Sequence, residues 1–409
     1  MSLGSGANTG ELVQRHSPWL AVAGVCGVYV SFGLAIGVMA PLVDEISVDL
    51  GLSRSTMGSI LGAWALIYVF TAVPGGAVVD RLGLRWSLFA GGLSIAASLL
   101  LRSLADGPVT LFLAVAVFGI GGPLVSIATP KLVASLFDAD DRRLPTGLGV
   151  ASPALGSAIA LATTNPLLLP AFDGNWRAVL LVMSAASLIA SFGWLYASRA
   201  VTHVRQGDTR TDPSTIRRLL KLRSMRTILT ISVFSFFFSH ALSNWLPEIL
   251  TDTGQTDNAA GYLAAISVTV GILGSLTTVR LVPSHRRPHA LVAIFVLVGL
   301  MVAGLGSLPF ALLSIALGVL GFCRAGIIPL LFLEIMGDPD IGLGDIGAAT
   351  GLFFAVGEIG GFTGPYAIGW VADATDGFGA ATLLLTAVAG AAAVSATALR
   401  FARGTTDVY

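Results

Sequence analysis

Long apolar runs separated by short polar segments form the main hydrophobic pattern of this chain. A helix needs about 20 apolar residues to cross the hydrocarbon of a bilayer, and its backbone groups must bond within the segment. Twelve runs fit this description, and each predicts a membrane-spanning helix. They cover residues 19–42, 57–79, 86–104, 109–137, 146–169, 178–196, 227–250, 259–281, 290–308, 310–336, 346–371 and 378–399.

The composition supports a bilayer as the natural solvent. Hydrophobic residues make up 55% of the 409 residues and charged residues only 11%, whereas a soluble protein carries about 25% charged residues. This excludes an ordinary soluble enzyme, and we expect no enzymatic activity. A net charge of zero supplies no basic surface for nucleic acid, so no nucleic-acid partner is expected.

The basic residues predict an orientation. If the N-terminus is cytoplasmic, 18 of the 23 Lys and Arg lie in cytoplasmic segments. Arg54, Arg102 and Arg177 then lie on the outside, and Lys131 and Arg324 lie within spans. This asymmetry follows the positive-inside rule. We therefore expect a multi-pass protein of the cytoplasmic (inner) membrane with both termini cytoplasmic.

One long polar interruption divides six runs from six. It covers residues 198–224, with a short surface helix expected near 216–222. The sequence therefore predicts an N-terminal six-helix bundle over 1–197, a cytoplasmic linker over 198–224 and a C-terminal six-helix bundle over 225–409. A solvated linker explains the interruption better than a regulatory segment does.

The two halves also repeat each other. Gly51-Leu-Ser53 matches Gly254-Gln-Thr256 at an offset of 203 residues, and Thr146-Gly-Leu matches Thr350-Gly-Leu at 204. Two matches at nearly one offset, each at the same place in its half, indicate a duplicated unit. The fold class expected is an all-α membrane protein with twelve transmembrane helices in two pseudo-symmetric six-helix bundles, and a solute site near the midplane between them.

A glycine-rich loop lies between the second and third runs. Gly76, Asp80, Arg81, Gly83 and Arg85 stand in the order Gly-x-x-x-Asp-Arg-x-Gly-x-Arg. Glycines allow a tight turn or close approach, and the carboxylate can face a helix N-terminus or pair with either arginine. Such a loop can act as a gate that holds one conformation closed, or it can be a plain turn with topogenic arginines.

This loop resembles the cytoplasmic loop motif of the major facilitator superfamily. One position departs, because Leu84 replaces a basic residue, and the corresponding loop of the second half has lost the motif. The resemblance implies alternating access and proton coupling. Within the superfamily, Gly119-Ile-Gly-Gly, Pro130-Lys131 and Thr146-Gly147 are similar to cyanate/nitroimidazole-type permeases.

Small residues and prolines mark the fifth and eleventh runs. Pro153 and Gly156 partly match the antiporter motif of drug exporters, and Gly360, Gly364 and Pro365 stand in the eleventh run. Small residues let helices pack closely and proline bends them, so a packing role explains these residues as well as a coupling role does.

Two ionisable residues lie near the middle of their spans. Charge within hydrocarbon costs several kcal/mol, so Arg324 and Glu358 each require a partner or a cavity. Arg324 could bind an anionic substrate through forked hydrogen bonds, and Glu358 could carry a proton or act as a switchable counter-ion. The alternative is a permanent Arg324–Glu358 ion pair that braces two helices.

Further polar residues are candidates for substrate binding. Lys131 lies near the cytoplasmic end of its span, where it can snorkel or contact substrate. His240 and Asn244 are one helical turn apart, with Trp245 beside them, so they could line a cavity. A histidine hydrogen-bonded to a neighbouring helix is an equally good interpretation.

The function expected is secondary transport by alternating access. The solute is expected to be a small anion, because the basic residues placed in the spans outnumber the single deep carboxylate. The alternative is a proton-coupled exporter of drugs or amphiphiles. The expected partners are the solute, protons and the lipid bilayer, with the monomer as the working unit. No cofactor and no metal are expected, because no phosphate-binding loop and no metal-ligand spacing occur.

Overall fold

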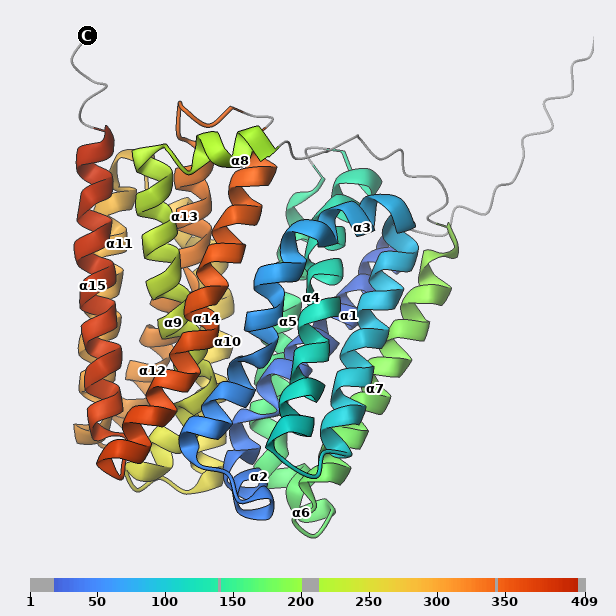
Figure 1. Ribbon diagram of the computed structural model, residues 1–409, viewed down its shortest axis with the longest axis vertical. Helices are drawn as coiled ribbons and strands as arrows, with labels where there is room; N and C mark the ends of the chain where they lie inside the picture. Colours follow the sequence, from blue (N-terminus) through green and yellow to red (C-terminus); the bar gives the residue numbers. More distant parts are fainter. Residues whose placement is uncertain (1–17, 139–140, 201–212, 343–344, 404–409) are drawn as a thin grey trace, which may run out of the picture.

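The computed structural model describes residues 18–138, 141–200, 213–342 and 345–403, and nearly all of these residues are helical. The long helices lie side by side across the molecule (Figure 1). We call the end that holds Pro18 and Arg403 the terminal face, and the opposite end, which holds α2 and α6, the loop face (Figure 1). The orientation of these faces in a cell stays a prediction.

The first half comprises the helices before the polar linker. They are α1 (Pro18–Gly37), α2 (Val43–Leu50), α3 (Arg54–Ser103), α4 (Pro108–Leu136), α5 (Arg143–Thr163), α6 (Leu169–Ala171) and α7 (Trp176–Ala197). Short turns η1 (Ala40–Leu42) and η3 (Ser198–Ala200) flank α2 and α7, and one π-helical turn, η2 (Thr164–Leu168), joins α5 to α6.

The second half repeats this arrangement. After the linker helix α8 (Pro213–Leu219), its helices are α9 (Arg223–Asp252), α10 (Asp257–Leu281), α11 (Arg287–Ala303), α12 (Phe310–Ala325), α13 (Ile327–Met336), α14 (Ile346–Thr375) and α15 (Gly379–Arg403), with short turns η4 (Ser284–Arg286) and η5 (Leu305–Ser307). The surface helix of the linker begins three residues earlier than expected, and linker residues 201–212 lie outside the described residues.

The twelve-span prediction is confirmed once α3 is counted as two spans. Within the described residues, eleven helical segments are long and apolar enough to cross a membrane. One of them, α3, has 50 residues, which would measure about 75 Å against a hydrocarbon core of about 30 Å. Gly83 breaks it with a φ of 77°, a conformation that glycine adopts without strain. The loop motif therefore lies at the junction of two spans on the terminal face.

The duplication predicted from sequence is visible in backbone geometry. Asp173 and Asp376 have φ values of 52° and 50°, and no other non-glycine residue among those described has a positive φ. Gly156 and Gly360 each lie where a Cβ would come within 2.0 Å of a carbonyl oxygen, that of Val30 or of Val233. Both pairs of positions are related by offsets of 203 or 204, so each half closes its own bundle in the same way.

Among the described residues, two pairs of long helices make most of the contact between the halves. We call the contact of α3 with α14 the first seam and that of α5 with α10 the second seam. A Cβ at Gly58 would lie 2.3 Å from the carbonyl oxygen of Pro365, and a Cβ at Gly261 would lie 2.8 Å from that of Leu161. These contacts occupy equivalent positions in the repeat, so the same kind of glycine-to-carbonyl contact occurs at both seams.

The glycines of the predicted loop differ in their roles. Gly83 supplies the break, but Gly76 lies inside the helix with no neighbouring atom within 4 Å of an added Cβ. The expectation of a tight turn or close approach at Gly76 is therefore wrong for this conformation, because the helix continues through it to the break at Gly83.

Candidate functional site

A break in the tenth span places Arg324 at a helix end. Pro329 has no N–H to donate to the carbonyl of Ala325, and the helix is interrupted at Gly326. Arg324 therefore lies in the last turn of α12, where a cation interacts favourably with the helix dipole. The break leaves a positive side chain near the middle of the membrane-spanning region.

The Arg324 side chain is held by α9. Its Nη1 donates to the backbone oxygen of Ser239 at 3.0 Å and to Oγ of Ser243 at 2.8 Å. Its Nε is buried without a hydrogen-bond partner among the described residues, and so is Oγ of Ser267 on α10. The guanidinium is thus fixed on one side and retains hydrogen-bonding capacity on another.

Arg324 also lines a small cavity at the second seam. The cavity has a volume of about 10 Å³, which is room for about one water molecule. Ser243, Ser267 and Leu161 are among its other lining residues, and Leu161 belongs to the first half. A fixed cation and two hydroxyl groups therefore meet at a position that both halves touch.

His240 and Glu358 form a second polar cluster, at the first seam. Nδ1 of His240 on α9 lies 3.5 Å from Oε2 of Glu358 on α14, and neither atom has a hydrogen-bond partner among the described residues. A Cβ at Gly361 would lie 2.3 Å from Oε2 of Glu358 and 2.4 Å from Nδ1 of His240. The absence of a side chain at Gly361 is what lets the two groups meet.

Aromatic residues of the first half cover this pair. The ring of Trp64 on α3 lies 4.9 Å from the imidazole of His240, measured between centroids. Tyr68, one turn further along α3, shares a 2.6 Å hydrogen bond with Ser126 and lies 6.5 Å from the ring of Phe354 on α14. The titratable pair of the second half therefore touches the first half directly.

The remaining predicted binding residues lie in different places. Asn244 donates from Nδ2 to the backbone oxygen of His240 at 2.8 Å, so it braces α9 beside the cluster. Trp245 is fully buried and donates from Nε1 to the backbone oxygen of Pro365 at 2.8 Å. Trp245 thus packs helix against helix and does not line the cavity, unlike the arrangement expected from its sequence position.

The Arg324–Glu358 ion pair, which the sequence left open as an alternative, is not formed in this structure. Arg324 donates its hydrogen bonds to α9, and the titratable side chain within 4 Å of Glu358 among the described residues is that of His240. The interpretation of these two residues as a permanent brace is therefore wrong for this conformation. The cation and the carboxylate belong to different seams.

Lys131 belongs to the terminal-face loop. Its Nζ lies 2.5 Å from Oδ1 of Asp80, so the loop carboxylate pairs with α4. Arg81 is exposed, and the guanidinium of Arg85 lies 5.5 Å from the ring centroid of Trp86. This arrangement makes Lys131 a partner of the predicted gate and separates it from the substrate cluster.

Two buried charged residues were not expected from the sequence, which placed Arg102 on the outside and did not single out Glu334. Arg102 is 1% exposed and donates to the backbone oxygen of Ala35 at 2.7 Å, near the end of α1. Glu334, near the end of α13, is 2% exposed. Glu358 is therefore not the only buried carboxylate among the described residues, so a count of buried charges does not favour an anion. Both residues lie toward span ends, where sequence alone suggests water.

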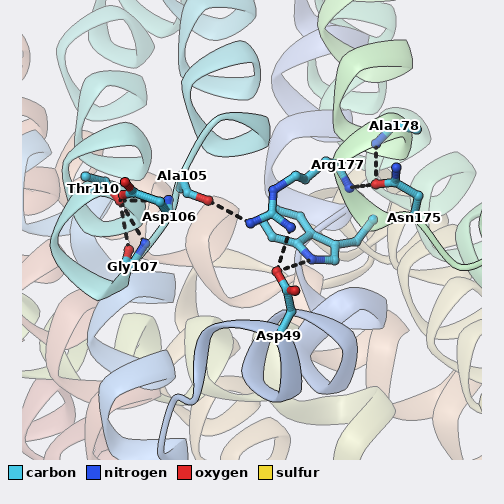
Figure 2. A network of polar contacts seen from close by, with 9 residues as sticks. Asp49, Ala105, Asp106, Gly107, Thr110, Asn175, Arg177 and Ala178 are labelled. Atoms are coloured by element: carbon cyan, nitrogen blue, oxygen red, sulfur yellow. Dashed lines mark hydrogen bonds and ion pairs between the residues drawn. The ribbon is translucent and has the colours of Figure 1, made fainter.

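The loop face has a polar network of its own, shown in Figure 2. Arg177 of α7 donates to Asp49 of α2 at 2.5 Å and to the backbone oxygen of Ala105 at 3.0 Å. The indole of Trp176 also donates to Asp49, at 3.3 Å. All of these residues belong to the first half, so the network ties α2 to its own bundle.

Comparisons with known proteins agree with this architecture. The sequence profile of the Major Facilitator Superfamily matches residues 25–365. The chain is 30% identical over 249 residues to the 2-nitroimidazole transporter of Escherichia coli K12, a match that spans 59% of this chain and 60% of that protein. It is 24% identical to the hexuronate transporter of Bacillus subtilis 168, over 90% of each chain.

A solved structure shares the fold. It is a bacterial homolog of the human lysosomal transporter Spinster, in an inward-facing and unoccupied conformation, with a TM-score of 0.76 and 13% identity over 95% of this chain and 98% of that one. The resemblance seen in the loop motif is confirmed by the sequence profile. This chain belongs to the Major Facilitator Superfamily, and it is a multi-pass membrane transporter.

Proposed function

We propose that this protein moves a small anion across the cytoplasmic membrane by alternating access, driven by protons. The observation that carries the proposal is the placement of Arg324. Its guanidinium is held by Ser239 and Ser243 while Nε has no partner among the described residues. A permanently charged group fixed in this way is organised to bind a carboxylate or a similar anion.

The position of Arg324 suits a transport site. The cavity beside it is lined from both halves, because Leu161 contributes from α5 and Ser267 from α10. A solute bound there would contact both bundles, as a site at the interface of two repeats requires. At about 10 Å³ the cavity holds no solute now, so binding requires the second seam to widen.

His240 and Glu358 supply the proposed coupling to protons. A proton on either group changes the charge of a buried pair that touches Trp64 of the other half. The change therefore alters the free energy of the closed first seam. Imidazole and carboxylate groups exchange protons readily, so the pair can follow a proton gradient.

The relatives support the anion class. Hexuronates are sugar acids whose carboxylate is ionised at neutral pH, and the hexuronate transporter aligns with 90% of this chain. An arginine at the site would neutralise such a group.

The second candidate is a proton-coupled exporter of drugs or amphiphiles. It is favoured by the aromatic rings of Trp64 and Phe236, which lie beside His240, and of Phe354, which packs against Phe236 from another helix. Aromatic surfaces bind flat apolar molecules and cations. An exporter of this kind would depend on the first seam and be indifferent to Arg324.

The experiment uses purified protein in proteoliposomes with an imposed pH gradient. Uptake of radiolabelled D-glucuronate, D-galactonate and cyanate is compared with that of 2-nitroimidazole and of tetraphenylphosphonium, a lipophilic cation. Each probe is tested with the parent protein, with Arg324→Ala and with Arg324→Lys. Arg286→Ala, an exposed arginine on the terminal face, is the matched control.

The expected result is proton-driven uptake of at least one anion. Arg324→Ala should lower that uptake at least tenfold, Arg324→Lys should retain part of it because the charge remains, and Arg286→Ala should match the parent. The anion proposal fails if Arg324→Ala leaves uptake of every anion unchanged. Transport of the cation or the neutral probe alone would establish the exporter instead.

A further inference from the structure

The first seam is closed at the loop face by a contact between two helix ends. The N-terminus of α3, in the first half, meets the C-terminal turn of α14, in the second. The backbone N–H of Arg54 donates to Oδ1 of Asp373 at 3.0 Å, and that of Ser55 donates to Oδ2 at 2.7 Å. One carboxylate thus accepts two hydrogen bonds from the other bundle.

These bonds complete a helix cap that the first half supplies only in part. The first four N–H groups of a helix have no partner within it. Ser53 accepts from the N–H of Thr56 at 3.2 Å, as a local N-cap does. Asp373 accepts from the two N–H groups before it, so a residue of the second half finishes the end of α3.

The side chain of Arg54 adds a second electrostatic attraction between the end of α3 and the end of α14. A cation in the first turn of a helix opposes the dipole of its own helix but suits the negative end of another. The Arg54 side chain reaches the backbone oxygen of Ala372 at 3.4 Å and lies 5.6 Å from the ring centroid of Phe378. Its ion pair with Asp376, at 3.8 Å, involves a fully exposed carboxylate and contributes little.

Close backbone packing makes this contact specific to the closed seam. Gly58 and Gly62 lie where an added Cβ would come within 2.3 Å of Pro365 and 2.8 Å of Phe362. The ends of α3 and α14 can therefore meet only while the seam is shut at the loop face. When α14 moves away, two N–H groups of α3 lose their charged acceptor.

The second seam lacks such a contact at the equivalent positions. The repeat places Asp257 where Arg54 stands and Asp173 where Asp376 stands, so the basic residue of the first seam is replaced by a carboxylate. Leu169 or Pro170 stands where Asp373 does, and neither has a side chain that can accept a hydrogen bond. The cap is thus a property of one seam only.

We infer that Asp373 is a latch: its carboxylate caps α3 across the first seam and sets how often the loop face opens. Removing the carboxylate removes two charge-assisted hydrogen bonds from the closed state only. The open state loses nothing, since water solvates the freed N–H groups there. The equilibrium therefore shifts toward opening by about tenfold, the effect of deleting an N-cap carboxylate.

The test measures a distance across the loop face. Spin labels are placed at Val48→Cys in α2 and Asn258→Cys in α10, both exposed, in a Cys26→Ser, Cys323→Ser background. Double electron–electron resonance on the full chain in lipid nanodiscs gives the populations of short and long distances. No solute and no gradient are present, so the result does not depend on the proposed substrate or coupling.

Three variants and a control separate the latch from a folding defect. Asp373→Asn keeps an acceptor oxygen without charge, and Asp373→Ala removes it. Ser55→Pro removes one donor from the other side, and proline is tolerated in the first turn of a helix. Asp376→Asn is the matched control, because this carboxylate is fully exposed and Asn also adopts its positive φ.

The expected result is graded. The ratio of long to short distances should rise about tenfold in Asp373→Ala and less in Asp373→Asn, while Asp376→Asn matches the parent. Ser55→Pro should raise the ratio too, and combining it with Asp373→Ala should add little. The latch is refuted if Asp373→Asn and Ser55→Pro both give the parent distribution. Equal thermal unfolding of the variants identifies the shift as conformational.

Discussion

The two seams share one backbone contact and carry different chemistry. Gly58 and Gly261 occupy equivalent positions and approach the carbonyl oxygens of Pro365 and Leu161, respectively. The first seam adds the His240–Glu358 pair and the Asp373 cap. The second adds the fixed cation Arg324 beside a water-sized cavity. Duplication supplied the geometry of both seams, and later divergence gave them separate chemistry.

The separation of Arg324 from the His240–Glu358 pair affects how a proton gradient could drive anion transport. A carboxylate beside Arg324 would satisfy the cation and compete with a bound anion. Because Glu358 lies with His240 at the other seam, the cation stays available while the titratable pair still contacts the first half through Trp64. On the proposed mechanism, binding and coupling communicate through the relative position of the two bundles.

The largest effect on transport is expected from replacing the glycines at which the two halves pack most closely. Gly58→Ala should lower the initial rate of proton-driven uptake at least tenfold, because its Cβ would lie 2.3 Å from a carbonyl oxygen. Gly261→Ala, at 2.8 Å, should lower it less. Gly351→Ala is the control, since nothing lies within 4 Å of its added Cβ. Equal rates for Gly58→Ala and Gly351→Ala would contradict the role of the first seam.

Separating the titratable pair should have the next largest effect. Gly361→Ala forces apart Glu358 and His240, whose atoms would lie 2.3 and 2.4 Å from the new Cβ. Accumulation driven by a pH gradient should fall about tenfold, while exchange of labelled for unlabelled anion should persist. Measuring both in the same vesicles checks this. Loss of exchange to the same extent would mean that the glycine serves packing alone.

A smaller effect on transport is expected from removing one of the two hydrogen bonds that hold Arg324. Ser243→Ala removes the 2.8 Å bond to Arg324 and leaves the bond to Ser239. The KM for the transported anion should rise about fivefold with little change in maximal rate, since the loss of one bond to a charged group weakens binding. Ser275→Ala, whose hydroxyl bonds only its own helix, is the control. An unchanged KM would show that Ser243 does not position Arg324.

The smallest effect is expected on the terminal face. Lys131→Gln removes the ion pair with Asp80, whose two side chains are 36% and 24% exposed. Partly exposed pairs contribute about 1 kcal/mol or less, so the uptake rate should change no more than about threefold. Initial rates at low and high salt measure this. A loss as large as that of Gly58→Ala would make the loop a main gate and reverse the ranking of the two faces.

Sequence reasoning reached the spans, the repeat and two of the central residues. The cost of charge in hydrocarbon identified Arg324 and Glu358, because a charge at mid-span requires a partner or a cavity. The spans are apolar around most of their circumference, so the pattern does not tell which side of a helix faces which neighbour. The pairing of Glu358 with His240, and of Arg324 with Ser243, depends on that rotation and emerged only in three dimensions.

Other residues were missed for different reasons. Trp64 is one aromatic residue among many in apolar runs, and nothing in its sequence context marks contact with His240. Asp373 stands at the end of a span, where a carboxylate is ordinary, and its role depends on a helix end more than 300 positions away. Glu334 and Arg102 lie near span ends as well, yet both are buried.

The central claim is that the two seams divide anion binding from proton coupling, and one comparison tests it most directly. Anion exchange and proton-driven accumulation are measured in proteoliposomes for Arg324→Ala and Glu358→Gln, using the anion that the parent transports. The account predicts that Arg324→Ala loses both activities, whereas Glu358→Gln keeps exchange and loses accumulation. Exchange that survives in Arg324→Ala, or accumulation against the anion gradient in Glu358→Gln with protons as the only driving force, would contradict it.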